Sequence, residues 1–286
     1  MPDSAYHLTL PRQRRSCVVF ASPHGCGVYP ESFLRQSQLD TLAIRSSEDA
    51  FVDELFAAAP EFGAPLLRAG MPRAFLDLNR STDELDPALI EGARRHGHNP
   101  RVASGLGVIP RVVANGRAIY RGRLPMAEAQ ARIAAYWQPY HSVLQSLLDD
   151  AHARHGQAIL IDCHSMPHEA MDGVARTARR RPEIVLGDRF GAAAGADIVD
   201  RIEAAFSAAG LTVTRNAPFA GAYVTQAYGR PSRRQHAIQI EIDRALYMDE
   251  TRVVKSIDFE VFRALLRRVI ADIAGIRREE MPLAAE

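Results

Sequence analysis

Two short apolar runs in this 286-residue chain each lead into a histidine, and they constrain the fold more than any other feature. Residues 17–21 precede Ser-Pro-His24, and residues 158–162 precede Cys-His164. A continuous apolar run rich in β-branched residues is typical of a strand buried on both faces. Because ligands bind open α/β sheets at the carboxyl ends of their strands, the two histidines are expected at one rim. They are about 140 residues apart in the sequence.

Strands and helices are expected to alternate along most of the chain. We expect helices over 49–59, 125–155, 197–209 and 258–277, and strands over 17–21, 64–69, 74–78, 158–162, 184–186, 211–215 and 237–242. No linker-like change in composition interrupts this alternation. The sequence therefore predicts one three-layer α/β domain over residues 17–286, preceded by a polar, loosely held arm over residues 1–16.

Composition excludes several other classes of protein. The chain has 35 Lys and Arg against 34 Asp and Glu, so its net charge of +1 favours neither nucleic acid nor an anionic membrane as a partner. No apolar run is long enough for a signal peptide or a membrane-spanning helix. Three cysteines are too few and too scattered for a disulfide framework. We expect a reduced, cytoplasmic protein of unknown oligomeric state.

The two histidines are candidate metal ligands. A catalytic zinc site usually takes three protein ligands, and the acidic pair Glu48-Asp49 could supply the third beside His24 and His164. Asp162 precedes His164 by two residues, so on a strand both side chains share a face and the carboxylate could orient the imidazole. Each histidine could instead be a surface residue or a hydrogen-bonded core residue. The residues alone leave both interpretations open.

Glu241 is the next unusual residue. Residues 237–242 alternate, with three isoleucines on one face and Gln239 and Glu241 on the other. One interpretation is a carboxylate on a half-exposed strand. The other is a general base whose pKa is set by burial and a nearby metal. Arg244 lies just beyond and, with Gln239, suggests a polar pocket.

Two groups of arginines have similarly divided interpretations. Arg73 and Arg80 flank a segment that also holds Asp77 and Asn79. Guanidinium groups bind carboxylates with two parallel hydrogen bonds, so this segment could bind an anionic substrate or form an ion pair with Asp77. The arginines within 176–181 form either a solvated surface loop or a loop that gathers substrate.

Several stretches together resemble the N-formylglutamate amidohydrolase family, a group of zinc-dependent deacylases. They occur in order over roughly residues 18–250. The matching stretches are Ser22-Pro-His-Gly25 with Tyr29-Pro30, Ser47-Glu-Asp49 with Val52-Asp-Glu-Leu55, Arg73–Arg80, Tyr136-Trp-Gln-Pro-Tyr-His141, Asp162-Cys-His-Ser-Met-Pro167, Leu186-Gly-Asp188, Asn216–Gly229, His236-Ala-Ile-Gln-Ile-Glu241 and Leu246-Tyr-Met-Asp249.

The resemblance implies a fold similar to zinc carboxypeptidases and aspartoacylases, with a mixed, mostly parallel twisted sheet and helices on both faces. It also implies one zinc ion on His24, an acid of the Glu48-Asp49 pair and His164. Between the two acids we favour Asp49, because the family pattern keeps aspartate at that position. Glu241 would then act as the general base.

The implied reaction is hydrolysis of N-formylglutamate, or a similar small N-acyl amino acid, to formate and glutamate. Arg73 would stabilise the developing oxyanion. Asn79 and Arg80 would bind the substrate carboxylate, with Arg244 a further substrate-binding residue. The chain has Gln226 where the family tends to have arginine, which leaves the substrate side chain less well defined than the reaction.

Three alternatives remain beside this interpretation. A related N-acyl amino acid deacylase could have a different specificity. A cysteine hydrolase could use Cys26 or Cys163, which lie beside the two histidines, although neighbouring residues on a strand point to opposite faces. A binding protein could keep the fold and the metal without catalysis, although such a protein has no use for a base at Glu241.

Overall fold

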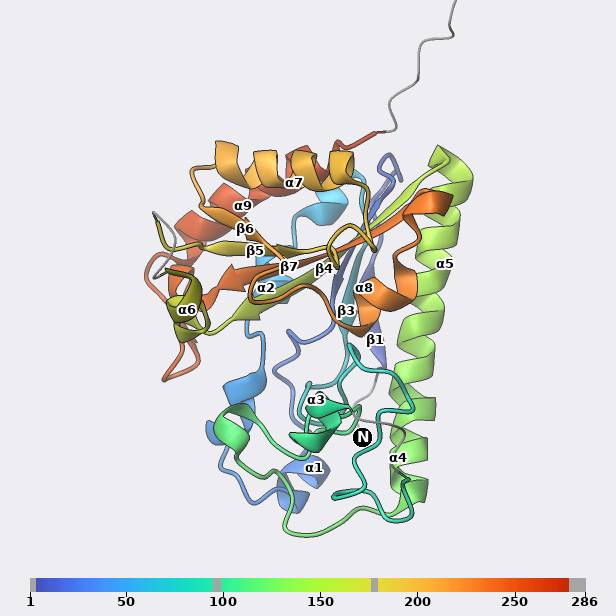
Figure 1. Cartoon of the computed structure of the whole chain (residues 1–286), viewed down its shortest axis with the longest axis vertical. Helices are drawn as coiled ribbons and strands as arrows, with labels where there is room; N and C mark the ends of the chain where they lie inside the picture. Colours follow the sequence, from blue (N-terminus) through green and yellow to red (C-terminus); the bar gives the residue numbers. More distant parts are fainter. Residues whose placement is uncertain (1–3, 95–98, 176–179, 278–286) are drawn as a thin grey trace, which may run out of the picture.

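The central sheet of the computed structural model, which describes residues 4–94, 99–175 and 180–277, has seven strands (Figure 1). Their order is β1-β3-β2-β4-β7-β5-β6. Neighbouring strands are parallel except at β1–β3 and β7–β5. The strands are β1 (Tyr6–Thr9), β2 (Val18–Ser22), β3 (Leu66–Ala69), β4 (Ala158–Met166), β5 (Ile184–Gly187), β6 (Val213–Arg215) and β7 (Gln235–Asp243). The predicted mixed, mostly parallel sheet is confirmed.

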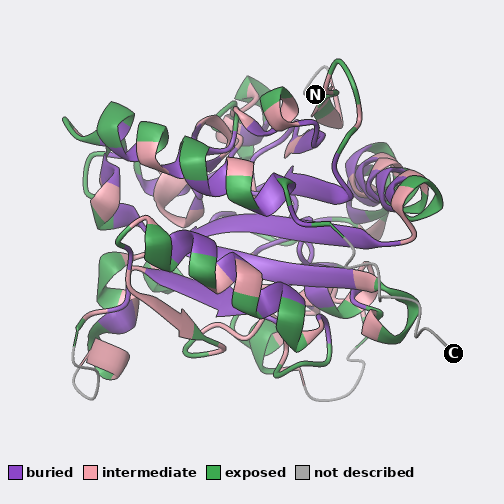
Figure 2. Cartoon of the chain, turned by 90° about the horizontal axis from the view of Figure 1, so that it is seen from above, coloured by how far each residue is buried: buried purple, intermediate pink, exposed green. Residues whose placement is uncertain are grey.

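Helices cover both faces of this sheet, and buried strands lie between them (Figure 2). One face packs against α2 (Val52–Leu55), α7 (Ala196–Ala208) and α9 (Phe259–Ala274). The other packs against α4 (Met126–Arg132), the π-helical turn η4 (Ile133–Trp137), α5 (Gln138–His155) and α8 (Tyr223–Tyr228). Shorter elements are α1 (Glu31–Gln36), α3 (Pro100–Ala103), α6 (Asp172–Ala175), and the ribbon of β8 (Met248–Asp249) and β9 (Val254–Lys255). Short 3-10 helices are η1 (Ala43–Ser47), η2 (Ala59–Phe62), η3 (Ala114–Gly116), η5 (His168–Met171), η6 (Pro231–Arg233) and η7 (Arg244–Leu246).

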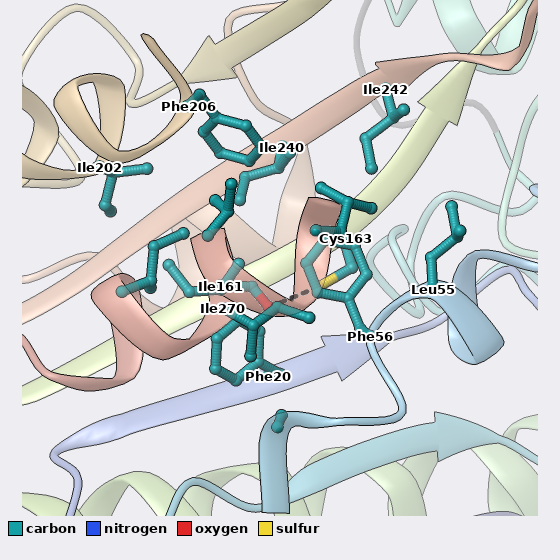
Figure 3. Packing of buried hydrophobic residues seen from close by; sticks show 14 of the residues in the cluster. Phe20, Leu55, Phe56, Ile161, Cys163, Ile202, Phe206, Ile240, Ile242 and Ile270 are labelled. Atoms are coloured by element: carbon teal, nitrogen blue, oxygen red, sulfur yellow. Dashed lines mark hydrogen bonds between the residues drawn. The ribbon is translucent and has the colours of Figure 1, made fainter. Parts of the chain in front are cut away.

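Alternate residues of β2 show how the strands divide between the two layers. Val18 and Phe20 belong to the apolar cluster under α7 and α9, whereas Val19 belongs to the cluster under α5. In the first cluster the ring of Phe20 lies 5.8 Å from that of Phe56, centroid to centroid (Figure 3). Cys163 of β4 lies in the same cluster. Alternate residues of β2 therefore face the two helical layers, as the predicted three-layer arrangement requires.

The arm predicted over residues 1–16 is wrong for residues 6–9. These residues form the edge strand β1, which pairs antiparallel with β3. A four-residue edge strand with one face toward solvent carries little apolar signal, so the polar composition concealed it. Gly70 fits this edge, because a Cβ at this position would lie 2.1 Å from the carbonyl oxygen of Ser4.

Two other expected elements are also wrong. The helix predicted over 49–59 is the single turn α2, which starts only at Val52 because Phe51 adopts a left-handed backbone conformation with φ of 66°. The strand predicted over 74–78 is a series of turns, although its residues are buried. The apolar residues at 74–78 are buried in an irregular segment and do not belong to the sheet. The remaining expected helices and strands are present, with ends shifted by a few residues.

The long helix predicted over 125–155 is present but contains the π-helical turn η4. Pro139 explains the interruption, since proline has no backbone N–H and its ring clashes with the preceding helical turn. The amide of Gln138 donates to the carbonyl of Ile133, five residues earlier. Gly156 ends the helix in a left-handed conformation. None of the helices among the described residues is long and apolar enough to cross a membrane.

The packing of Phe20 leads to a stability prediction. Phe20→Ala should lower the free energy of unfolding by about 3–5 kcal/mol, because it removes a fully buried ring and leaves a cavity between the sheet and α9. Phe190→Ala is the control, since this ring is 80% exposed and its loss should change stability by less than about 0.5 kcal/mol. Urea unfolding monitored by circular dichroism measures both. Equal midpoints for the two variants would contradict the prediction.

Candidate active site

His24, Asp49 and His164 meet at the carboxyl ends of two neighbouring strands. His24 follows β2 by two residues, His164 lies within β4, and Asp49 precedes α2. The carboxylate Oδ2 of Asp49 lies 3.4 Å from Nδ1 of His24 and 3.0 Å from Nδ1 of His164. All three side chains are buried, and their possible ligand atoms lie within 4.8 Å of one another. The structure thus brings together the three residues predicted as metal ligands.

A carboxylate holds the far side of each imidazole. Nε2 of His24 lies 2.7 Å from Oδ1 of Asp77, and Nε2 of His164 lies 2.9 Å from Oδ2 of Asp162. Each carboxylate favours the tautomer in which Nε2 carries the proton, so the lone pair of each Nδ1 faces Asp49. The prediction that Asp162 orients a histidine is confirmed. Asp77, expected only as a partner of arginine, has the same relation to His24.

Arg244 holds the other oxygen of Asp49. Its Nη2 donates to Oδ1 of Asp49 at 3.0 Å, and its Nε donates to Oγ of Ser165 at 3.1 Å. Oδ2 of Asp49 is therefore the oxygen that faces the histidines. This contact between Arg244 and Asp49 spans 195 residues and was not anticipated from the sequence.

Glu48, the neighbouring acid, faces a different set of partners. Its carboxylate accepts hydrogen bonds from Arg45 at 2.9 Å and from the hydroxyl of Tyr29 at 3.2 Å. The buried group that could hold a metal contains Asp49 and not Glu48. Of the two acids left open by the sequence, Asp49 is the one placed beside the histidines.

The charges of this cluster fit a cation between the three side chains. Nδ1 of His24 is buried without a hydrogen-bond partner among the described residues. Burial alone would lower the pKa of His164, but Asp162, Asp49 and Glu241 raise it well above its usual value. Burial acts to raise the pKa of Asp49, yet the two histidines bring it well below its usual value. The same acidic surroundings that raise the pKa of His164 would favour a metal cation bound between the three side chains.

Glu241 lies beside this group on the neighbouring strand. In the parallel pairing of β4 and β7 it is the register partner of His164. It is buried, which excludes the half-exposed strand considered from the sequence. Gln239 donates to its Oε1 at 2.8 Å. Burial, with a further contribution from Asp49, raises the pKa of Glu241 to about 7, although the cationic groups nearby oppose the rise.

A cavity of about 430 Å³ opens onto the histidines and Glu241. Arg73 lines it and donates from Nε to Oδ2 of Asp77 at 3.1 Å. Arg80 also lines it and is 4% exposed. Its Nε has no hydrogen-bond partner among the described residues and lies 4.0 Å from Asp77 and 3.8 Å from Glu84. Arg80 is thus a buried cation with room for an anionic ligand.

Asn79 lies in the same cavity wall with its amide group already engaged. Its Nδ2 donates to Oδ2 of Asp162 at 3.2 Å, and its Oδ1 accepts from the amide of Val224 at 2.7 Å. Nδ2 also lies 3.2 Å from Nε2 of His164. Asn79 therefore links the histidine, its carboxylate and the start of α8.

The remaining residues considered from the sequence lie elsewhere. Burial raises the pKa of the Cys163 thiol well above its usual value and that of Cys26 to about 11, so neither is a ready nucleophile. Cys163 faces the apolar layer, away from His164. Gln226 lines a second cavity of about 840 Å³, which shares Arg80 with the first. Residues 176–179 of the arginine loop lie outside the described residues.

The fold and this site define an α/β protein with a buried His-Asp-His group at the carboxyl ends of its central strands. The chain belongs to the N-formylglutamate amidohydrolase family, whose model matches residues 16–248. This confirms the resemblance drawn from the sequence motifs, and it makes the chain a member of a family of amidohydrolases.

Relatives support this assignment over most of the chain. The N-formylglutamate deformylase of Pseudomonas aeruginosa is 32% identical over 240 residues, covering 81% of this chain and 83% of that protein. The N-formylglutamate deformylase of Pseudomonas putida is 28% identical over 246 residues, covering 84% of each. The crystal structure of N-formylglutamate amidohydrolase from Ralstonia eutropha superposes with a TM-score of 0.87 at 34% identity, covering 94% of this chain and 96% of that one.

The geometry of the cluster leads to a prediction about metal binding. His164→Ala should lose a bound divalent metal, because it removes one of three ligands. Asp162→Asn keeps all three ligands but loses the carboxylate that orients His164, so metal affinity should fall by about 10–100-fold. Competition with a chromophoric chelator measures the affinities. His155→Ala at the end of α5 is the control, and a full equivalent of metal in His164→Ala would contradict the ligand assignment.

Proposed function

We propose that this protein is a zinc-dependent amidohydrolase that removes the formyl group from an N-acyl amino acid such as N-formylglutamate, giving formate and glutamate. One observation carries the proposal. The two imidazoles, each held by a carboxylate, direct Nδ1 toward Asp49 while the buried Glu241 lies on the adjoining strand. Family membership supports the same reaction type.

The proposed metal is a single zinc ion on His24, Asp49 and His164. Two imidazoles and one carboxylate are a donor set typical of catalytic zinc, which keeps a fourth position for water or substrate. When bound, zinc would supply Lewis acidity that polarises the acyl carbonyl and makes water a better nucleophile at neutral pH.

Glu241 is the proposed general base and acid. Gln239 holds its Oε1, so Oε2 is the oxygen available to the reacting groups. The carboxylate accepts the proton of the attacking water and then delivers it to the departing amine. A pKa of about 7 suits both transfers, because a group that must gain and lose a proton works best near the working pH.

The arginines give the cavity its proposed preference for anionic substrates. Arg73 is the candidate for stabilising the oxyanion, and Asp77 already fixes its direction. We assign the carboxylate of the substrate chiefly to Arg80, which supplies the charge, with Asn79 beside it held in place by its bonds to Asp162 and Val224. Arg244 lines the same cavity and is the further substrate-binding candidate, beside its contact with Asp49.

A related deacylase of different specificity is the second candidate. Gln226 lines the larger cavity next to Arg80, at a position where the family tends to have arginine. An amide there can bind a neutral or an anionic side chain. The acyl-binding site and the base would be unchanged, so only the amino acid would differ between the two candidates.

Metal analysis combined with a substrate panel tests the proposal. We expect one equivalent of zinc, and release of amine from N-formylglutamate faster than from other N-formyl and N-acetyl amino acids. A faster reaction with another amino acid would favour the second candidate. Bound zinc without turnover of any member of the panel would overturn the enzyme assignment and favour a metal-containing binding protein.

Glu241→Gln provides the sharpest test of the base. Glutamine keeps the size of the side chain but cannot accept the proton, so kcat should fall by about 10²–10⁴-fold while zinc stays bound. Glu260→Gln on the surface of α9 is the matched control, with no expected effect. Turnover of Glu241→Gln near that of the parent would remove Glu241 as the base.

The raised pKa of Glu241 sets the expected pH dependence. Only the deprotonated carboxylate can accept a proton, so kcat/KM should rise about tenfold per pH unit at acidic pH and level off no higher than about pH 7, the pKa that the protein alone gives Glu241. Bound zinc favours the charged carboxylate and moves this limb toward lower pH. Gln239→Leu removes a donor to the carboxylate and should move the limb back up. A flat profile between about pH 5 and 8 would contradict this role.

A further inference from the structure

The motif at residues 136–141 has no part in the proposed chemistry, yet it contacts the substrate-binding segment directly. Nε1 of Trp137 donates to the carbonyl oxygen of Arg80 at 2.9 Å. Nε2 of His141 lies 2.9 Å from the carbonyl oxygen of Leu78. Both side chains come from the long helix on one face of the sheet (Figure 1).

These contacts supply hydrogen-bond donors to backbone carbonyl groups of the segment 73–80. It was expected to contain a strand but forms turns, so its buried carbonyl groups have no sheet neighbour to pair with. A buried carbonyl without a partner costs as much as a lost hydrogen bond. Besides Trp137 and His141, Arg132 contributes a third donor, from Nη1 to the carbonyl oxygen of Phe75 at 3.1 Å.

The π-helical turn explains why these donors lie on one face. Arg132 and Trp137 are five residues apart, a spacing that points side chains in different directions on an α-helix. A π turn closes hydrogen bonds from residue i to i+5, so residues five apart lie above one another. His141 follows Trp137 by four residues on regular α-helix and continues the same face.

The surroundings of His141 fix its role as a donor. The hydroxyl of Tyr228 lies 2.8 Å from Nδ1 and can donate to it. Burial lowers the pKa of His141 to about 4, so the ring is neutral near pH 7 and carries its proton on Nε2. The indole of Trp137 stacks on this ring with 3.9 Å between centroids. The two aromatic residues therefore form one packed unit.

We propose that Trp137, supported by His141, is a positioning residue for Arg80. The hydrogen bond from Trp137 to the carbonyl oxygen of Arg80 fixes the backbone position of Arg80, and with it the point from which the Arg80 side chain extends. This matters because, among the described residues, the charged partners of the Arg80 guanidinium are Asp77 and Glu84, at the loose distances of 4.0 and 3.8 Å. The inference rests on the proposed role of Arg80 in binding the substrate carboxylate.

Trp137→Phe tests the proposal, because it keeps an aromatic ring and removes the indole N–H. We expect KM for N-formylglutamate to rise about tenfold with kcat within about twofold of the parent, since binding common to ground state and transition state is lost. Zinc content should not change. A fall in kcat with unchanged KM would overturn the proposal.

Tyr140→Phe is the matched control. Tyr140 lies on the same long helix and is fully buried, whereas Trp137 is partly buried, and the Tyr140 hydroxyl makes no hydrogen bond among the described residues. It should leave KM unchanged. If Trp137→Phe folds poorly, two variants at His141 test the proposal instead. His141→Gln keeps an N–H that can donate to the carbonyl oxygen of Leu78, whereas His141→Leu does not. The KM of His141→Gln should therefore be lower than that of His141→Leu. Equal KM values for this pair would count against the proposal.

A double-mutant cycle separates positioning from a general structural effect. If Trp137 acts through Arg80, Trp137→Phe should add no further rise in KM to Arg80→Ala. Effects on KM that simply add would overturn the proposal. An unchanged KM in Arg80→Ala alone would instead show that the proposed substrate-binding role of Arg80 is wrong.

Amide hydrogen exchange gives a measurement that does not depend on turnover. In Trp137→Phe, exchange at residues 76–80 should be at least about tenfold faster than in the parent and in Tyr140→Phe. Unchanged exchange would overturn the positioning role even if the enzyme is active. Faster exchange in a protein that hydrolyses none of the panel would uphold the positioning and contradict the proposed function.

Discussion

The parallel pairing of β4 with β2 and β7 is the constraint on which the rest of the site depends. The pairing sets β2, β4 and β7 side by side with their carboxyl ends at one rim, so His24, His164 and Glu241 share that rim. The strands are buried on both faces, and a slip of one residue would turn each side chain into the apolar layer. The apolar clusters on the two faces therefore fix the register, and the register fixes the geometry of the site.

The buried charges explain why this rim is suited to a cation. Asp49, Asp77, Asp162 and Glu241 place four carboxylates within a small buried volume, and the nearby guanidinium groups belong to Arg73, Arg80 and Arg244. Removing so many charges from water is costly unless each is paired. The structure pairs each aspartate with a histidine or an arginine, while Nδ1 of His24 has no hydrogen bond within the part of the chain that the structure describes. A divalent metal held by His24, Asp49 and His164, as proposed above, would complete this pairing.

Much of the fold and part of the site could be predicted from the sequence, for identifiable physical reasons. The buried strands and long helices have strong apolar periods, and the step of two residues between Asp162 and His164 fixes a shared face on β4. The predictions for residues 6–9 and 74–78 were wrong. Edge strand β1 has few apolar residues, so its composition favours an arm. Residues 74–78 are mostly apolar, so their composition favours a strand, although they form turns outside the sheet. Contacts across long separations in sequence were also missed.

Those missed contacts share a cause that concerns the site itself. The pairing of Arg244 with Asp49 and of Trp137 with Arg80 joins residues 195 and 57 positions apart, and neither has a local pattern. In both cases the contact orients a residue of the site, Asp49 in the first and Arg80 in the second. A strand at 73–80 would satisfy its own carbonyl groups but would direct alternate side chains away from the cavity. The turns instead direct Arg73, Asp77, Asn79 and Arg80 to one cavity, and the hydrogen bonds they lack come from the helix that contains the π turn.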